Sequence, residues 1–237
     1  SHAEVNAIDS VKDKSLLPDS TLYVNLEPCS HFGKTPPCAD LIIEKKIKKV
    51  IISNLDPNPL IAGNGVKKLK KAGCMVQSGI LENKGYMLNR RFFTFHNKRR
   101  PYIVLKWAET QDGFMVKKGC GSRWISNKLS RKLVHKWRSE EDAIMVGTNT
   151  AKLDNPKLNT RDWSGKDPVR IVIDRQRRLK DDLNIFDKKN LTLCYNTKLN
   201  DEKKNLIFIK INDWNNVLEE IFSDLYSRNI QSLLVEG

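Results

Sequence analysis

Apolar and polar positions alternate along the first part of the chain in a pattern typical of βαβ units. Runs of β-forming residues at 21–26, 50–53 and 74–79 flank two segments with helical spacing, 40–49 and 65–72. Short strands separated by helices predict parallel pairing, because each helix returns the chain to the same edge of the sheet. We therefore predict an α/β layer in this part of the chain.

A second alternation of the same kind follows Pro101, which opens a predicted strand over 102–108. Ser126 is the expected N-cap of a helix that ends at Arg138, and a second, amphipathic helix is expected over 214–228. Further strands are predicted at 143–147, 169–174, 191–195, 206–211 and 232–236. This pattern indicates a second α/β domain.

The stretch between the two alternations is helical and then strongly basic. We predict domains over 1–80 and 101–237, joined by a linker helix over 81–100, and a chain of 237 residues is long enough for both. The chain does not begin with Met, and its last predicted strand is followed at once by the final residue. We therefore expect both domains to lack a terminal part.

The composition favours a soluble protein with an anionic partner. Hydrophobic residues make up 39% of the chain, no apolar run approaches a membrane span, and the net charge is +14. The lysines are scattered over short helices with few aromatic residues between them, which favours solvated helix faces over a nucleic-acid platform. Phosphorylated metabolites and NADPH are the other anionic candidates. Five cysteines at irregular spacing do not form a disulfide framework and indicate a reducing, cytoplasmic location.

Four residues form a zinc-type motif. His2 precedes Glu4 by two positions, and Cys29 and Cys38 follow in the same domain. One His and two Cys that leave a fourth position open, with a Glu that moves protons, is the pattern of zinc deaminases. The alternative is that His2 is a stray terminal residue and the cysteines are buried packing, but that alternative requires the whole set to arise by chance.

The spacing and surroundings of these residues are specific. Eight residues separate Cys29 from Cys38, whereas nucleoside and tRNA deaminases carry two. The sequences EPCSHFGKTPPC (27–38), HAEVNAI (2–8) and DPNPLIAGNG (56–65) resemble the deaminase domain of the bifunctional riboflavin-biosynthesis family. The resemblance implies substrate contacts from His31, Lys34, Asp56 and Asn58, although the DPNP sequence is also ordinary turn chemistry.

The second half has no Gly-x-Gly-x-x-Gly fingerprint, and its function rests on resemblance. The sequence PYIVLKWAETQDG (101–113) resembles the reductase domain of the same family, which is similar in fold to dihydrofolate reductase. The expected fold is therefore a zinc cytidine-deaminase-like domain followed by a dihydrofolate-reductase-like α/β domain. The resemblance implies NADPH contacts from Ala108, Trp124, Thr150, Asp154 and Arg175, and substrate contacts from Ser122, Arg138, Leu158, Arg161 and Glu236.

Physical chemistry supports some of these roles and leaves others open. Arg138 and Arg161 suit a ribose phosphate, because a guanidinium binds phosphate through two hydrogen bonds. For Trp124 and Leu158, core packing is the alternative. At position 175 the family often has Ser, whereas this chain has Arg175, whose guanidinium would suit the NADPH 2′-phosphate. Lys106 and Asp112 are candidates for polarising or protonating the sugar oxygen, and a surface salt bridge is the alternative for that pair.

The resemblance implies two consecutive steps of riboflavin biosynthesis. The first is zinc-dependent deamination of 2,5-diamino-6-(5-phosphoribosylamino)pyrimidin-4(3H)-one, and the second is NADPH-dependent reduction of 5-amino-6-(5-phosphoribosylamino)uracil to the ribityl compound. The alternatives are a single-activity zinc nucleoside or RNA deaminase, a basic nucleic-acid-binding protein without activity, and an inactive fragment. We expect a homo-oligomer whose partner is this phosphorylated pyrimidine, with neither a membrane nor nucleic acid as a partner.

Overall fold

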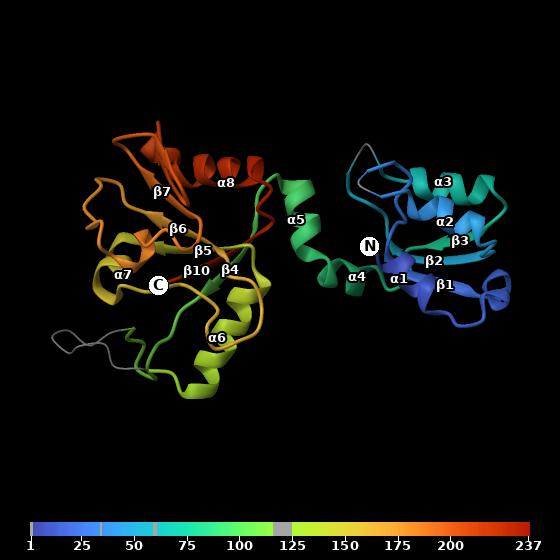
Figure 1. The fold of residues 1–237 in the computed structure, drawn as a ribbon, viewed down its shortest axis with the longest axis horizontal. Helices are drawn as coiled ribbons and strands as arrows, with labels where there is room; N and C mark the ends of the chain where they lie inside the picture. The colour runs from blue at the N-terminus through green and yellow to red at the C-terminus, as the bar shows by residue number, and fades with distance from the viewer. Residues whose placement is uncertain (1, 34, 59–60, 116–124) are drawn as a thin grey trace. The chain divides into compact units, whose positions relative to one another are not determined.

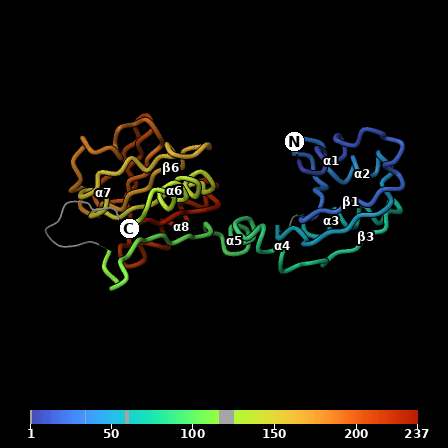
Figure 2. The backbone as a smooth tube through the Cα atoms, turned by 90° about the horizontal axis from the view of Figure 1, so that it is seen from below, coloured from blue at the N-terminus to red at the C-terminus, as the bar shows by residue number. Residues whose placement is uncertain are grey.

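The computed structural model describes residues 2–33, 35–58, 61–115 and 125–237. The chain forms two compact units, Ser1–Asn97 and Lys98–Gly237, and the colours of Figures 1 and 2 show that each unit is one continuous stretch of the sequence. None of the helices in the described part of the chain is both long and apolar enough to cross a bilayer. Each unit is described below by itself.

The first unit contains a three-stranded sheet in the order β1-β2-β3, with both strand pairs parallel. The parallel α/β layer predicted from the alternation of apolar runs is therefore confirmed. Its elements are α1 (Ala3–Ser10), a 3₁₀ helix (Lys14–Asp19), β1 (Thr21–Leu26), α2 (Cys38–Glu44), β2 (Lys49–Asn54), α3 (Asn64–Lys71), β3 (Met75–Ser78), α4 (Glu82–Leu88) and α5 (Arg90–Lys98).

A single apolar cluster holds the helices of the first unit to its sheet. Ile8 of α1, Ile42 of α2 and Leu69 of α3 pack with Val50 and Ile52. These two residues lie two positions apart on β2, so their side chains point to the same face of the sheet. All five side chains are at most 2% exposed. This packing fixes the start of α1 and the start of α2 relative to the end of β1.

The second unit contains a seven-stranded sheet in the order β4-β10-β5-β6-β7-β9-β8, parallel except for the last strand. The strands are β4 (Tyr102–Lys106), β5 (Ala143–Gly147), β6 (Val169–Ile173), β7 (Thr192–Asn196), β8 (Asp201–Lys203), β9 (Leu206–Lys210) and β10 (Ser232–Glu236). The helices are α6 (Lys128–Glu140), α7 (Thr148–Asp154), α8 (Val217–Ser227) and 3₁₀ turns at Asn184–Phe186 and Trp214–Asn216.

Helices cover both faces of this sheet. Ile221 and Leu225 of α8 pack on one face, whereas Ala151 of α7 and Trp137 of α6 belong to the cluster on the other. Figure 1 shows α8 and α6 on opposite sides of the strands. The central strands are buried on both faces, as parallel sheets in α/β proteins usually are.

Three local features differ from the sequence-based expectation or go beyond it. The N-cap of α6 is Asn127, whose side chain accepts a hydrogen bond from the Ser130 amide, so the prediction of Ser126 was wrong. The short antiparallel strand β8 was not predicted, because three residues carry no measurable periodicity. Helices α4 and α5 occupy the stretch 81–100, where one linker helix was predicted, and the linker and domain boundaries stay a prediction.

Arg170 is a buried charge that ties β6 to the 184–190 loop. It is 1% exposed, and its guanidinium donates to Thr192 Oγ1 (3.0 Å), to the carbonyls of Asn184 and Asn190 (3.0 Å each) and to Asp187 (2.7 Å). Burial alone would raise the pKa of Asp187, but the hydrogen bonds from Arg170 and the Lys189 amide, together with the charge of Arg170, lower it below its ordinary value.

We expect Arg170→Met to destabilise the second unit by about 3 kcal/mol or more, because it leaves buried acceptors and a carboxylate without their donor. Circular dichroism during urea unfolding measures the change. The matched control is Lys136→Met, which removes an exposed i,i+4 pair with Glu140 on α6 and should cost at most about 1 kcal/mol. Equal losses in the two variants would contradict the role given to Arg170.

Candidate functional site

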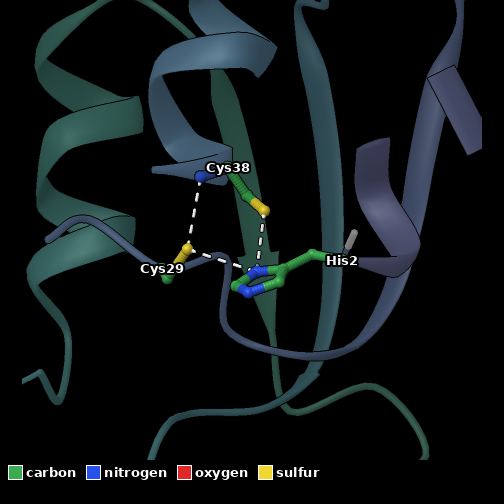
Figure 3. A group of neighbouring side chains, drawn as sticks. All are labelled: His2, Cys29 and Cys38. Carbon is green, nitrogen blue, oxygen red and sulfur yellow. Dashed lines mark hydrogen bonds between the residues drawn. The ribbon is translucent and has the colours of Figure 1, made fainter. Parts of the chain in front are cut away.

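Three side chains meet at one point of the first unit. His2 Nδ1 lies 3.6 Å from Cys29 Sγ and 3.3 Å from Cys38 Sγ, and the three ligand atoms lie within 4.8 Å of one another. Figure 3 shows the imidazole nitrogen turned toward both sulfurs. The Cys38 amide, at the start of α2, donates to Cys29 Sγ over 3.2 Å, which holds the two sulfur-bearing segments together.

The geometry of this cluster fits a zinc ion. In a tetrahedral zinc site the Zn–N bond is about 2.05 Å and the Zn–S bond about 2.3 Å. A nitrogen and a sulfur bound to the same ion therefore lie about 3.6 Å apart. The observed separations of 3.6 and 3.3 Å are close to that value. A neutral imidazole and two thiolates are the donors that zinc prefers, and three protein ligands leave the fourth position for a water. The predicted His2, Cys29 and Cys38 set is therefore assembled by the fold.

The surroundings of Cys38 disfavour the deprotonated form of its thiol in the protein alone. Burial raises the pKa of the Cys38 thiol well above its usual range, and the nearby Glu4 carboxylate and Cys29 raise it further. A divalent cation reverses this effect, because it coordinates and stabilises the deprotonated sulfur. The cluster is thus electrostatically incomplete as protein alone and complementary to a metal ion.

Glu4 and the predicted substrate residues share one cavity of about 560 Å³ with the cluster. Its lining includes His2, Glu4, Cys29, His31, Asp56 and Asn58, together with Phe92 and His96 of α5. The fold brings Glu4 to the cluster because His2 is the N-cap of α1, so that Glu4 lies in the first turn of this helix. Lys34 lies outside the described residues.

Glu27 is an organising residue to which the sequence analysis gave no role of its own. It follows the last residue of β1 and is 4% exposed. Its carboxylate accepts hydrogen bonds from the amides of Asp56 (3.2 Å), Gly63 (2.9 Å) and Val66 (3.2 Å). Glu27 therefore caps α3, whose own N-cap Gly63 has no side chain, and ties the loop with Asp56 to the strand that leads into Cys29.

A close contact supports the same arrangement. A Cβ atom on Gly65 would lie 2.1 Å from the carbonyl oxygen of Pro28 and 3.1 Å from Glu27 Oε1. Only glycine fits there, so α3 packs directly on the backbone that precedes Cys29. The Glu-Pro-Cys motif was a visible signal for Glu27, but the amides that donate to its carboxylate are 29 to 39 residues away in sequence.

The second unit holds a cavity of about 650 Å³ at the carboxyl ends of its strands. It collects seven of the predicted reductase residues: Lys106, Arg138, Thr150, Asp154, Leu158, Arg161 and Glu236. Basic groups of α6 and the 157–161 loop also line it, including Arg131, His135 and Lys157. An anionic ligand suits such a lining, because Arg161 is exposed and lacks a carboxylate partner among the described ion pairs.

Arg138 and Glu236 face each other inside this cavity. Arg138 Nε donates to Glu236 Oε1 over 2.9 Å and its second terminal nitrogen donates to Oε2 over 2.7 Å, a two-bond pair that is largely buried. Both residues were predicted to contact substrate. The structure places both in this cavity and commits most donors of Arg138 to protein, with the remaining terminal nitrogen 3.3 Å from the Asn159 carbonyl.

The other predicted reductase residues lie apart from this pair. Arg175 borders a smaller hollow shared with Thr150 and stacks 5.1 Å from the ring centre of Trp214. Asp112 is exposed and accepts a hydrogen bond from the Thr110 hydroxyl, and Ala108 follows the end of β4 without bordering the described cavities. Ser122 and Trp124 lie outside the described residues. Leu158 is 1% exposed and belongs to the core cluster as well as the cavity wall.

A His–Cys–Cys cluster with a glutamate beside it, on an α/β layer, defines a zinc-binding deaminase region, and a second α/β unit follows it. Comparison with known families agrees: residues 1–54 match the cytidine and deoxycytidylate deaminase zinc-binding region, and residues 101–237 match the RibD C-terminal domain. The chain belongs to the RibD family of riboflavin biosynthesis proteins. The resemblance seen in the sequence motifs is confirmed.

Individual relatives show how much of the family pattern is present. The chain is similar to the riboflavin biosynthesis protein RibD of Aquifex aeolicus, at 40% identity, and of Actinobacillus pleuropneumoniae, at 39%. Both alignments use 100% of this chain and cover 67% and 65% of the relative. The chain thus spans about two thirds of the length of these relatives.

Solved structures show the same likeness. A Thermotoga maritima diaminohydroxyphosphoribosylaminopyrimidine deaminase/5-amino-6-(5-phosphoribosylamino)uracil reductase matches with a TM-score of 0.89 and 39% identity. Acinetobacter baumannii RibD matches with a TM-score of 0.85 and 30% identity. Each comparison covers 100% of this chain and 67% of the solved chain.

We expect the purified chain to contain about one zinc per molecule, since the described residues contain one group of three zinc ligands. Replacing Cys29 and Cys38 together by Ser should reduce the zinc content to background in elemental analysis. Cys74→Ser is the matched control, because Cys74 is a half-buried free thiol outside the cluster, and it should retain the metal. Zinc that persists in the double variant would contradict the assignment.

Proposed function

We propose that this chain acts in riboflavin biosynthesis as a deaminase and a reductase on successive pyrimidine intermediates. The observation that carries the proposal is the cluster of His2, Cys29 and Cys38 with Glu4 in the same cavity, followed in the chain by a separate basic cavity. The first substrate is 2,5-diamino-6-(5-phosphoribosylamino)pyrimidin-4(3H)-one. The second is its deaminated product, 5-amino-6-(5-phosphoribosylamino)uracil, which is reduced to the ribityl compound. These activities are the ones that the Thermotoga relative is named for.

In the deamination, Glu4 carries the protons. Zinc, when held by His2, Cys29 and Cys38, supplies a Lewis acid that lowers the pKa of water. The Glu4 carboxylate accepts a proton from the attacking water and delivers it to the departing amine, so that a C–O bond forms, the C–N bond breaks and ammonia leaves. His31, Lys34, Asp56 and Asn58 are assigned to substrate contacts, and Glu27 holds the backbone at Asp56 in place through the hydrogen bond from its amide.

Glu4→Gln should lower the deamination rate by at least ~10², the usual scale for a lost general acid–base group. The amide has nearly the same shape as the carboxylate but accepts no proton, so the zinc content should stay unchanged. Ammonia release measures the rate, and elemental analysis serves as the control. A Glu4→Gln variant with wild-type turnover would exclude the proton-carrying role.

In the reduction, the second cavity holds the ribosyl phosphate. NADPH, when bound, supplies the hydride. Ala108, Trp124, Thr150, Asp154 and Arg175 are assigned to the cofactor, and Ser122, Arg138, Leu158, Arg161 and Glu236 to the substrate. The exposed guanidinium of Arg161 is the better phosphate ligand, because Arg138 is paired with Glu236 and instead orients that carboxylate toward the substrate hydroxyls. Lys106, which lines the cavity, is assigned to polarise the sugar oxygen, with Asp112 as the second candidate.

Arg161→Ala should raise the KM for the deaminated intermediate about ten- to a hundredfold with a small change in kcat, because phosphate anchoring is mostly uniform binding. The assay follows the loss of NADPH absorbance. Lys203→Ala, on β8 at the far edge of the sheet, is the charge-matched control and should behave as wild type. If NADPH oxidation does not depend on the intermediate, the reductase assignment is wrong and only the deaminase remains.

Location, assembly and domain limits complete the proposal. A cytoplasmic location is supported by the thiolate ligands, which need a reducing environment, and by the four described cysteines, which are free.

A homo-oligomer is supported by apolar side chains on edge strand β4 and just beyond it, where Leu105 is 64% and Trp107 is 53% exposed. We retain domain limits of 1–80 and 101–237 with a linker over 81–100. The reading as a single nucleoside or RNA deaminase is not favoured, because the reductase family model covers the second unit.

A further inference from the structure

The second cavity contains a buried histidine that the proposed reduction does not use. His135, on α6, is 4% exposed and lines the cavity. Its Nδ1 lies 2.9 Å from the carbonyl oxygen of Asn159, and its Nε2 lies 3.2 Å from a carboxylate oxygen of Asp162. The ring therefore joins α6 to the loop that presents Arg161 to the cavity.

These two contacts make different demands on the ring. A carbonyl oxygen only accepts hydrogen bonds, so Nδ1 of His135 carries a hydrogen. In the neutral ring Nε2 is then an acceptor, and it faces the Asp162 carboxylate, which is also an acceptor. Only the imidazolium, in which both nitrogens donate, satisfies Asn159 and Asp162 at the same time.

Positive charge around the ring opposes the imidazolium. Burial lowers the pKa of His135, and the guanidinium groups of Arg138 on α6 and Arg161 on the loop lower it further, whereas Asn159 and Asp162 raise it. Together these groups hold the pKa of His135 below its ordinary value, which favours the neutral ring. A dianion in the cavity would offset the two guanidinium charges and favour protonation.

We infer that His135 takes up a proton when a phosphate monoester enters the second cavity, and that the resulting ion pair with Asp162 fixes the loop that carries Arg161. His135 is thus a positioning residue, and the inference rests on the proposed function because it places the substrate phosphate in this cavity. By linkage, the bound anion and the proton raise each other's affinity by the same factor. Anion affinity increases as the pH falls through the pKa of His135 in the complex and levels off below the pKa in the free protein.

The test is an NMR titration of the chain with ¹⁵N-labelled histidine, with and without saturating ribose 5-phosphate. His135→Asn identifies the resonance among the four histidines, keeps a donor for the Asn159 carbonyl and cannot take up a proton. We expect saturation to raise the proton affinity of His135 about tenfold or more, which is one pKa unit. Asp162→Asn should lower the pKa of His135 in the free protein and preserve the response to ribose 5-phosphate.

Sulfate separates the protein's titration from that of the ligand. Phosphate monoesters titrate near pH 6, whereas sulfate keeps its charge, so a sulfate affinity that falls with rising pH reports on the protein. We expect this dependence in the wild type and its loss in His135→Asn. If ribose 5-phosphate binds but His135 titrates identically with and without it, the inference is wrong and the proposed cavity stands. If ribose 5-phosphate does not bind, the phosphate subsite of the proposed function is wrong, and the inference fails with it.

Discussion

Parallel pairing of strands is the constraint on which both candidate sites depend. In a parallel sheet all strands end at the same edge, and polar groups that follow them meet there although they are far apart in sequence. In the first unit, the residues after β1 supply Cys29 and those after β2 supply Asp56. In the second unit, β4 ends at Lys106 and its parallel neighbour β10 ends at Glu236, directly across in the register. The helices fill the two faces and leave this edge open to ligands.

A buried carboxylate stands at that edge in each unit, and each has a different counterpart. Glu27 is balanced by three backbone amides, whereas Glu236 is balanced by one guanidinium. Both arrangements give the buried carboxylate hydrogen-bond donors, without which an unpaired buried charge would destabilise the fold. Amides fix a loop without adding charge next to the segment that carries Cys29. A guanidinium adds positive charge to a cavity that is already basic, which suits a phosphorylated ligand.

The periodic parts of the fold and the motif-bearing residues were accessible from sequence, and the long-range partners were not. Strands 21–26, 143–147 and 232–236 have the predicted limits, because β5 and β10 are buried apolar runs and β1 is a run of β-forming residues. His2, Glu4, Cys29 and Cys38 came from spacing and residue type, which metal chemistry restricts tightly. The pairing of Arg138 with Glu236 spans 98 residues, and the role of His135 depends on a carbonyl 24 residues away. Such contacts are set by tertiary packing and leave no local pattern. The choice of Asn127 over Ser126 as a cap was undecidable for a related reason, since both residue types serve well.

The position of β10 between β4 and β5 has a consequence for how the second unit is made on the ribosome. Strand β4 is synthesised first, yet its partner in the sheet is β10, which emerges only after α6, α7, α8 and every other strand of the unit. Until then β4 has no neighbour in the described sheet, and an unpaired apolar strand is a site of aggregation. The three strands of the first sheet that the structure describes are instead neighbours in chain order. Nascent chains stalled before β10 should therefore depend on chaperones to keep β4 in solution while the preceding unit is already folded.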